Sequence, residues 1–281
     1  MAGVSTKAIK LRIKSMESTR QITKAMELVA ASKLRSAQAR AVASRPYFSA
    51  LYTAMSEIYN STPCFASPYI CGHKTGKSLF VVIAGDRGLA GGYNNNILKM
   101  AYAAIQKEDA VVLPIGKKSL EFFQRRGCEI LTDVYVEAGD VTAEDCGTLA
   151  ETLAKDFVKG KFKQISLYYT NFVSMLSQTP ATLELLPIAP PADGGKRKDI
   201  LYEGGSESVF NSIVPDYLGG MLYGALCESL ASEQAARRTA MDAASKNADE
   251  IIEDLNLRYN RARQGAITQE ITEIVAGSDQ S

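Results

Sequence analysis

The C-terminal stretch carries apolar and small residues in steps of three and four positions, and no proline follows Pro215. Arg258 interrupts the stripe, which then resumes in a slightly shifted phase; its members are Met241, Ala244, Ala248, Ile251, Leu255, Ala262, Ile267, Ile271 and Ile274. A stripe this narrow is typical of a coiled-coil seam rather than of the broad apolar face of a globular helix. The pattern predicts a long helix that needs a partner helix.

The segment from about Val4 to Tyr59 keeps the same step and contains no glycine and one proline, Pro46. It predicts a second helix of the coiled-coil type, which Pro46 should kink or end. Because the two helices lie at opposite ends of the chain, antiparallel pairing is the simplest arrangement. The predicted seam includes Ile22, Val29, Ala248, Ile251 and Leu255.

The middle of the chain follows a different period. Leu79–Ala84 is a continuous apolar run of the kind that is buried on both faces of a sheet. Strand-like and helix-like patterns then alternate: the further strands expected are Ala110–Ile115, Glu129–Val136, Gln164–Val173 and Ala181–Ile188, and the helices are Tyr93–Lys107, Lys117–Arg126 and Thr142–Lys159. This alternation indicates a Rossmann-like α/β domain with a largely parallel sheet.

Loop-like stretches rich in proline and glycine flank this domain at 61–78 and 187–205. The predicted fold is α/β, with an antiparallel coiled coil of long N- and C-terminal helices and an inserted Rossmann-like α/β domain. The predicted parts are an N-terminal coiled-coil helix over 1–60, the α/β domain with its loops over 61–205, and a C-terminal coiled-coil helix over 206–281. Pro215 should interrupt the last helix early.

Charge is distributed unevenly, although the net charge of the 281 residues is only +1. Ten basic residues stand against two acidic ones up to Arg45, whereas acidic residues outnumber basic ones by about two to one from Glu207 onward. The two ends of the chain are therefore electrically complementary. The basic helix could bind nucleic acid, but its charges are spread around the helix without aromatic residues among them, and an acidic protein surface explains them equally well.

Candidate chemistry is sparse. The glycine-rich loop Gly85–Gly92 lies between a strand and a helix, where phosphate loops lie, but its spacing is not G-x-G-x-x-G and no Gly-Lys-Ser/Thr closes it. Cys64, Cys71 and His73 do not have the spacing of a zinc site. His73 is the only histidine, which argues against Ser-His-Asp and Cys-His catalysis. We expect no cofactor, no metal and no catalytic site.

The chain has no run of apolar residues that could span a membrane and no signal peptide, so we expect it in the cytoplasm. Five scattered cysteines are expected to be reduced thiols. The residues alone lead to a mechanical or scaffolding protein. Two alternatives stay open at this point: a nucleotide-binding α/β enzyme with a coiled-coil oligomerisation arm, and a nucleic-acid-binding scaffold.

Three separated motifs resemble the γ subunit of the F-type ATP synthase, in the same order along the chain. Gln21–Arg35 is similar to part of the family's opening helix, and Gly85–Asn94 to its loop after the first strand. Ala231–Arg237 and Arg263–Val275 are similar to its closing helix. The resemblance covers nearly the whole chain, except for 61–78 and 187–205, which carry no recognisable motif.

The resemblance implies a non-catalytic central rotor shaft. In that family the paired terminal helices enter the ring of α and β subunits, and the α/β domain and lower coil sit on the ε subunit and the membrane-embedded c-ring. Ion flow through the c-ring turns the shaft, which couples it to ATP synthesis or hydrolysis at the β subunits. The implied location is the cytoplasmic face of the bacterial cell membrane, as a peripheral protein that contacts the membrane only through the c-ring.

The resemblance also suggests which residues contact the β subunit. Met26 matches the family position that faces the β-subunit lever region, with Lys24 and Lys33 as further candidates for its acidic surface. Arg263 and Gln264 match a polar pair that grips a β-subunit loop, and Thr268 matches the hydroxyl one turn further on. Two departures from the family pattern, glycine at 265 and serine at 278, stand where the family has alanine. Glycine at 265 should cost the helix about 1 kcal/mol relative to alanine.

Overall fold

The computed structural model describes residues 6–61, 65–134, 136–189 and 202–278. The chain divides into two compact units, one made of residues 1–30 and 238–281 and the other of residues 31–237. Two long helices, α1 (Thr6–Ser61) and α6 (Ser206–Ser278), contribute residues to both units. Residues 62–64, which include Cys64, and residues 190–201 lie outside the described residues.

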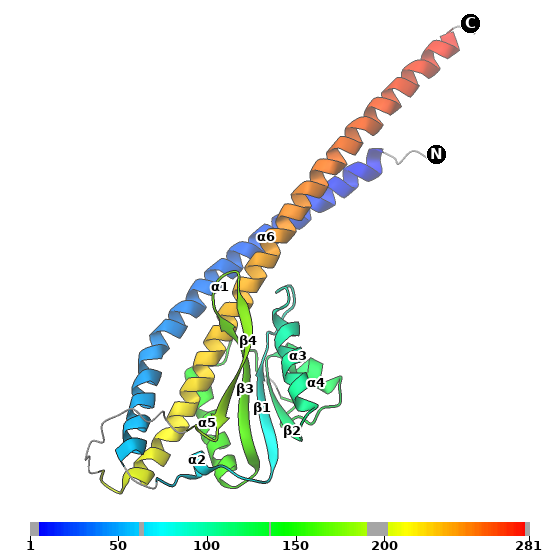
Figure 1. The fold of residues 1–281 in the computed structure, drawn as a ribbon. Helices are drawn as coiled ribbons and strands as arrows, with labels where there is room; N and C mark the ends of the chain where they lie inside the picture. The colour runs from blue at the N-terminus through cyan, green and yellow to red at the C-terminus, as the bar shows by residue number, and fades with distance from the viewer. Residues whose placement is uncertain (1–5, 62–64, 135, 190–201, 279–281) are drawn as a thin grey trace. The chain divides into compact units, whose positions relative to one another are not determined.

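The larger unit is built on a sheet of four strands in the order β2-β1-β3-β4 (Figure 1). The central strand β1 (Lys77–Ile83) pairs in parallel with β2 (Ala110–Ile115) and β3 (Phe162–Phe172), and β4 (Gln178–Leu186) pairs antiparallel with β3. The sheet is therefore mixed, with an antiparallel strand at one edge.

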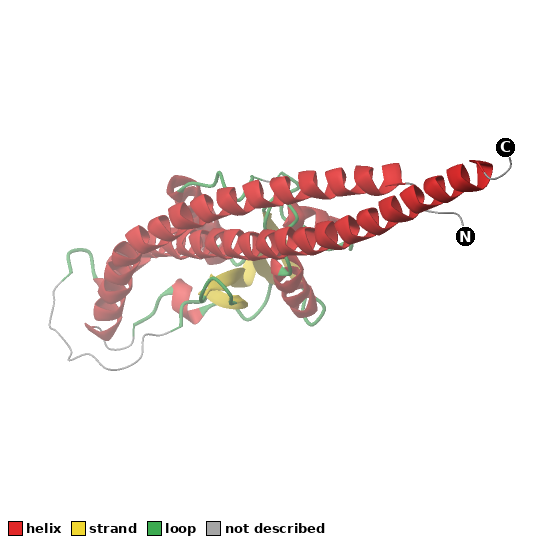
Figure 2. Cartoon of the chain, turned by 90° about the horizontal axis from the view of Figure 1, so that it is seen from above, coloured by secondary structure: helices red, strands yellow, loops and turns green. Residues whose placement is uncertain are grey.

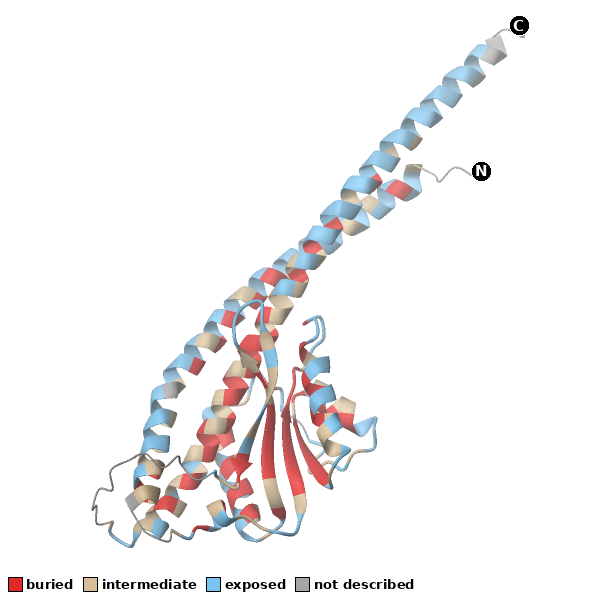
Figure 3. Cartoon of the chain, viewed as in Figure 1, coloured by how far each residue is buried: buried red, intermediate tan, exposed pale blue. Residues whose placement is uncertain are grey.

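Helices cover both faces of this sheet. On one face, α3 (Tyr93–Ile105) and α4 (Lys117–Gln124) pack over a cluster that includes Phe80, Val112 and Phe123. On the other face, α5 (Ala143–Val158) and the part of α6 within this unit pack over a cluster that includes Ile165 and Leu218. Figure 3 shows the central strands as buried along most of their length. Burial on both faces explains the unbroken apolar run of β1.

The described part of the sequence departs from the expected strands at one place. The predicted strand over 129–136 is wrong for the described residues of that stretch, which form one isolated bridge, from Ile130 to Val112 of β2. Val134 is 73% exposed, so the alternating apolar pattern here does not face a core. A short helix, α2 (Pro68–Cys71), capped by the Ser67 side chain, stands in the stretch expected to be a loop.

Both prolines lie inside helices that continue past them. Pro46 is within α1 and Pro215 is within α6, so the expectation that Pro215 interrupts the helix is wrong. Packing beside each proline accounts for this. The Phe48 ring lies against Gly220, where an added Cβ would be 2.1 Å from two ring carbons, and Val214 is fully buried. Tertiary contacts here outweigh the hydrogen bond that each proline removes.

Candidate functional site

The smaller unit is an antiparallel pair of helix segments, seen from a second direction in Figure 2. Three contacts fix their direction: Arg20 Nη1 donates to Asp249 Oδ1 at 2.9 Å, Thr23 and Ser245 share a hydroxyl hydrogen bond of 2.7 Å, and Arg238 Nε lies 3.8 Å from a carboxylate oxygen of Glu27. As the residue number on α1 rises, the residue number of its contact on α6 falls, which is the order that antiparallel helices give.

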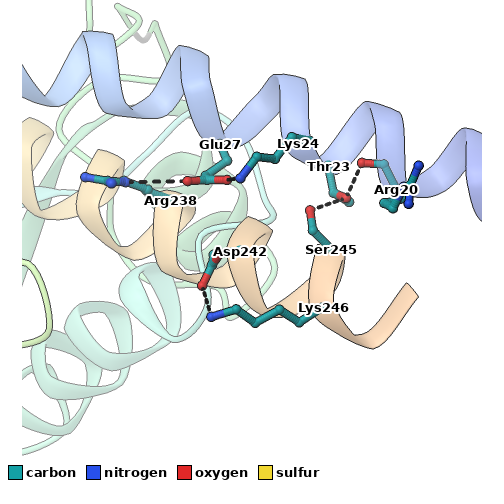
Figure 4. A network of polar contacts seen from close by, with 8 residues as sticks. All are labelled: Arg20, Thr23, Lys24, Glu27, Arg238, Asp242, Ser245 and Lys246. Carbon is teal, nitrogen blue, oxygen red and sulfur yellow. Dashed lines mark hydrogen bonds and ion pairs between the residues drawn. The ribbon is translucent and has the colours of Figure 1, made fainter. Parts of the chain in front are cut away.

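A charged cluster lies along this pair (Figure 4). The Glu27 carboxylate, whose side chain is 11% exposed, accepts a hydrogen bond of 2.7 Å from Lys24 Nζ and lies near Arg238. The hydrogen bond from Lys24 to Glu27, together with their attraction, raises the pKa of Lys24. On α6, Lys246 Nζ donates to Asp242 at 2.8 Å, which lowers the pKa of that carboxyl. Lys24, expected to face a partner's acidic surface, is therefore paired within its own chain.

The seam between the helices differs from the predicted one. Ala248 and Leu255 are buried, but Ile22, Val29 and Ile251 are 58%, 56% and 41% exposed, so placing these three in the seam is wrong. The neighbouring positions face inward instead: Thr23 and Ser245 are buried, and Ile252 is half-buried. One residue along a helix turns the side chain by about 100°, which moves it from the seam to the surface.

The seam was misplaced because two stripes fit the same spacing. The chain can step from Met241 through Ala248 to Leu255 by way of Ala244 and Ile251, or by way of Ser245 and Ile252. The more apolar stripe predicts Ile251 in the seam, but the helix buries the stripe that contains Ser245. A hydroxyl near the axis of a two-helix seam can be satisfied by a hydroxyl opposite, which is what Thr23 supplies.

The residues expected to contact a partner lie mostly on the surface of this unit. Arg263, Gln264 and Thr268 are exposed, and Thr268 Oγ1 donates to the Gln264 carbonyl at 2.9 Å. Met26 is half-buried. Lys33 is exposed and belongs to the larger unit.

Apolar side chains are exposed beside these polar groups. Ile267, Ile271, Ile274 and Val275 are 47% to 69% exposed. A groove lies beside the first residue of α1, Thr6. Its other lining residues include Tyr259, Arg263 and Glu270 of α6. Gly265 meets no other atom within 4 Å of the position of an added Cβ. The end of α6 thus presents a mixed polar and apolar surface.

The glycine-rich loop of the larger unit is filled by the chain's own side chains. The Asp86 carboxylate accepts hydrogen bonds from the backbone N–H groups of Lys117 (2.9 Å) and Ala138 (3.0 Å), and Asn94 Oδ1 accepts one from Gly85 N–H (2.8 Å). These backbone donors are the groups a phosphate would need. The loop therefore closes on itself, which argues against the nucleotide-site interpretation.

Sequence reasoning missed an ion pair of α6 that meets this loop. Arg237 Nη2 donates to Glu233 Oε1 at 2.6 Å and to the Gly88 carbonyl at 3.3 Å. The side chains of Arg237 and Glu233 are only 11% and 7% exposed. Burial raises the pKa of Glu233, and burial likewise raises the pKa of Tyr93. The signal was present as a Glu and an Arg four residues apart, a spacing that also occurs on solvated helix faces.

The remaining candidates that lie within the described residues assemble no site. The described residues contain no group of three or more His, Cys, Asp or Glu side chains placed to hold a metal ion. Cys71 is exposed and the His73 ring lies against Phe157, 5.2 Å between ring centres. No helix in the described part of the chain is both long and apolar enough to cross a membrane.

A mixed α/β sheet and a pair of long terminal helices define the class of fold to which this protein belongs. The sequence model of the family described as "ATP synthase" matches residues 5–279. The "ATP synthase gamma chain" of Ruminococcus albus is 46% identical over 278 residues, covering 97% of each chain, and that of Alkaliphilus metalliredigens is 40% identical over 99% of each. The chain belongs to the ATP synthase gamma chain family.

Solved structures share the fold. A chain from the Euglena gracilis mitochondrial ATP synthase, in a structure of its OSCP, F1 and c-ring, has a TM-score of 0.69 at 18% identity and covers 98% of this chain and 93% of its own. A chain from the central stalk and c-ring of the Tetrahymena thermophila enzyme has a TM-score of 0.60 at 24% identity, covering 80% of this chain and 99% of its own. At these identities the likeness concerns the fold: long terminal helices around a mixed sheet of four strands.

Proposed function

We propose that this chain is the central rotor shaft of a bacterial F-type ATP synthase, which mechanically couples ion flow through the membrane ring to ATP synthesis or hydrolysis on other chains. One observation carries the proposal: identity of 36% to 46% to gamma chains over nearly the full length of both sequences. A gamma chain is a rotor subunit and not the catalytic one.

The proposed partners are the ring of α and β subunits, the ε subunit and the c-ring, with no nucleic acid among them. The proposed location is the cytoplasmic face of the bacterial cell membrane, with membrane contact only through the c-ring. The α and β subunits would meet the helix pair, whose exposed surface mixes Arg263, Gln264 and Thr268 with Ile267 and Ile271. Contacts of this kind are small and exchangeable, as a rotating interface requires.

A rotor shaft must transmit torque without its two helices sliding along each other. Each unit charge that crosses about 100 mV releases about 2.3 kcal/mol, and the energy of several crossings must pass through the shaft for each ATP. The helix pair meets the demand with a seam in which small residues such as Ala248 allow close approach. Its ion pairs and its Thr23–Ser245 hydrogen bond oppose sliding of one helix along the other.

The test uses Met26→Lys in the assembled enzyme. Met26 is half-buried in a helix with a large excess of basic residues. A lysine there adds a charge-assisted hydrogen bond to acidic partner groups, worth about 1.5 to 3 kcal/mol if well formed. Because rotation must break that bond at every step, we expect ATP hydrolysis to continue while ion pumping per ATP falls. Both rates are measured in membrane vesicles that carry each variant.

Met100→Lys is the matched control, because Met100 is 38% exposed on α3 of the α/β unit. We expect it to leave the pumping ratio unchanged. A wild-type ratio for Met26→Lys would remove Met26 from the coupling surface. Failure of the wild-type chain to purify with the α, β and ε subunits would overturn the proposed function itself.

A further inference from the structure

The crevice at the carboxyl ends of β1 and β3 is occupied by helix α6. Open α/β sheets usually bind their ligands at such a place, where neighbouring strands lead to opposite faces. Here Ser229 Oγ accepts a hydrogen bond of 2.9 Å from Thr170 N–H, and Ser232 Oγ donates one of 3.1 Å to the Thr170 carbonyl. Both serines are fully buried. One turn of α6 is thus hydrogen-bonded to the end of β3.

The next turn of α6 is fixed to the loop after β1. An added Cβ at Gly85 would lie 2.8 Å from Glu233 Oε1, so the carboxylate rests directly on the backbone of the loop. Arg237 joins Glu233 to the Gly88 carbonyl, and Tyr93, at the start of α3, is buried close to Ser229 and Glu233. Polar contacts therefore hold two successive turns of α6 to β3 and to the loop.

Stability alone does not account for these polar groups. A buried ion pair loses most of its hydration, and replacing such a pair by apolar groups of similar size is often neutral or stabilising. The neighbouring positions Leu230, Ala231 and Ala235 bury apolar side chains against the same core. Apolar packing is non-directional, whereas hydrogen bonds specify one orientation of the helix. The polar contacts thus fix how α6 is rotated about its axis.

These polar contacts lie at the end of the larger unit along α6. Arg237 is the last residue of the larger unit, and α6 continues with Arg238 in the other. We propose that Glu233 and Arg237, supported by Ser229 and Ser232, form a torque joint that locks the rotation of α6 at the point where it leaves the α/β unit. This inference rests on the proposed function and makes the four side chains positioning residues for energy coupling.

The experiment removes the ion pair but keeps its volume, with Glu233→Gln and Arg237→Met combined. The assembled enzyme in vesicles is assayed for thermal unfolding, ATP hydrolysis and ATP-driven ion pumping against increasing membrane potential. We expect the double variant to assemble, to melt close to the wild-type temperature, and to hydrolyse ATP. Ion pumping per ATP should be lost progressively as the opposing potential rises, because a joint without directional contacts yields under load.

Two further variants make the result decisive. The control pair Glu151 and Lys155 has the same four-residue spacing on α5 but is 61% and 70% exposed, so the same double substitution there should change nothing. Arg237→Lys keeps the positive charge and should recover part of the pumping under load. The torque-joint proposal would be overturned if the Glu233→Gln/Arg237→Met enzyme pumped ions as the wild type does at all potentials. It would also be overturned if both that variant and Arg237→Lys failed to assemble. If the wild-type enzyme itself fails to pump, the proposed function fails instead.

Discussion

Leu255→Ala should locally open the helix pair of the smaller unit, whereas Ile251→Ala, one turn earlier on α6, should barely affect that pair. Leu255 is 6% exposed and Ile251 is 41% exposed. Truncating a buried leucine to alanine costs about 2 to 5 kcal/mol. Because the seam buries Leu255 against a single partner helix, we expect a value near the low end, about 2 kcal/mol. For Ile251 the lost contacts are partly offset by the better helix propensity of alanine, so we expect less than about 1 kcal/mol.

Amide hydrogen exchange read by mass spectrometry is the suitable assay, because it reports local opening that global unfolding can miss. Every 1.4 kcal/mol corresponds to about a tenfold change in exchange rate. The expected loss of about 2 kcal/mol should therefore speed exchange in peptides spanning 245–262 more than tenfold in Leu255→Ala. Ile251→Ala should change the same peptides by a few-fold at most. Equal effects of the two substitutions would refute the seam as the structure places it.

Three other predictions test particular contacts. Gly220→Ala should destabilise the α/β unit in chemical denaturation by about 1 to 3 kcal/mol, because its Cβ would overlap the Phe48 ring, and Phe48→Leu should relieve part of that loss. Gly265→Ala has open space around it and should slow amide exchange at the end of α6, worth about 1 kcal/mol of helix stability. The Thr142 N–H and hydroxyl lower the pKa of Asp145, so its contribution to stability is present above its ordinary pKa of 3.8 and is lost as the pH falls through the lower folded value. An NMR titration of Asp145, with Thr142→Ala as the comparison, checks that direction.

The sequence was most informative where a segment is buried on both sides. The run that forms β1 and the strand Ala110–Ile115 were predicted within two residues of the structure, since few other arrangements bury continuous apolar residues. The stretch after residue 128 misled because the alternation of Ile130 and Val134 resembles a strand, yet among the described residues pairing with β2 is confined to residues 129–131. An alternating pattern does not reveal whether a neighbouring strand edge continues alongside it.

The candidate site was predictable only in part. Repeats of three and four residues predict two paired helices. They do not distinguish the stripe that contains Ile251 from the stripe that contains Ser245 and Ile252, because that choice depends on the hydrogen bond between Ser245 and Thr23 on the opposite helix. Glu233 could not be singled out, because its significance comes from Gly85, far away in the sequence and adjacent in the fold. Contacts between distant segments determine whether a charged residue is solvated or buried.

Direct observation of rotation tests the account most directly. The α and β subunits of the purified complex would be fixed to a surface, and an optical probe would be attached to the exposed Lys107 position of the α/β unit through an introduced cysteine. We predict that adding ATP makes the probe turn in one direction and that removing ATP stops it. A probe that stays still while the same immobilised complexes hydrolyse ATP would contradict the assignment of this chain as the rotor shaft.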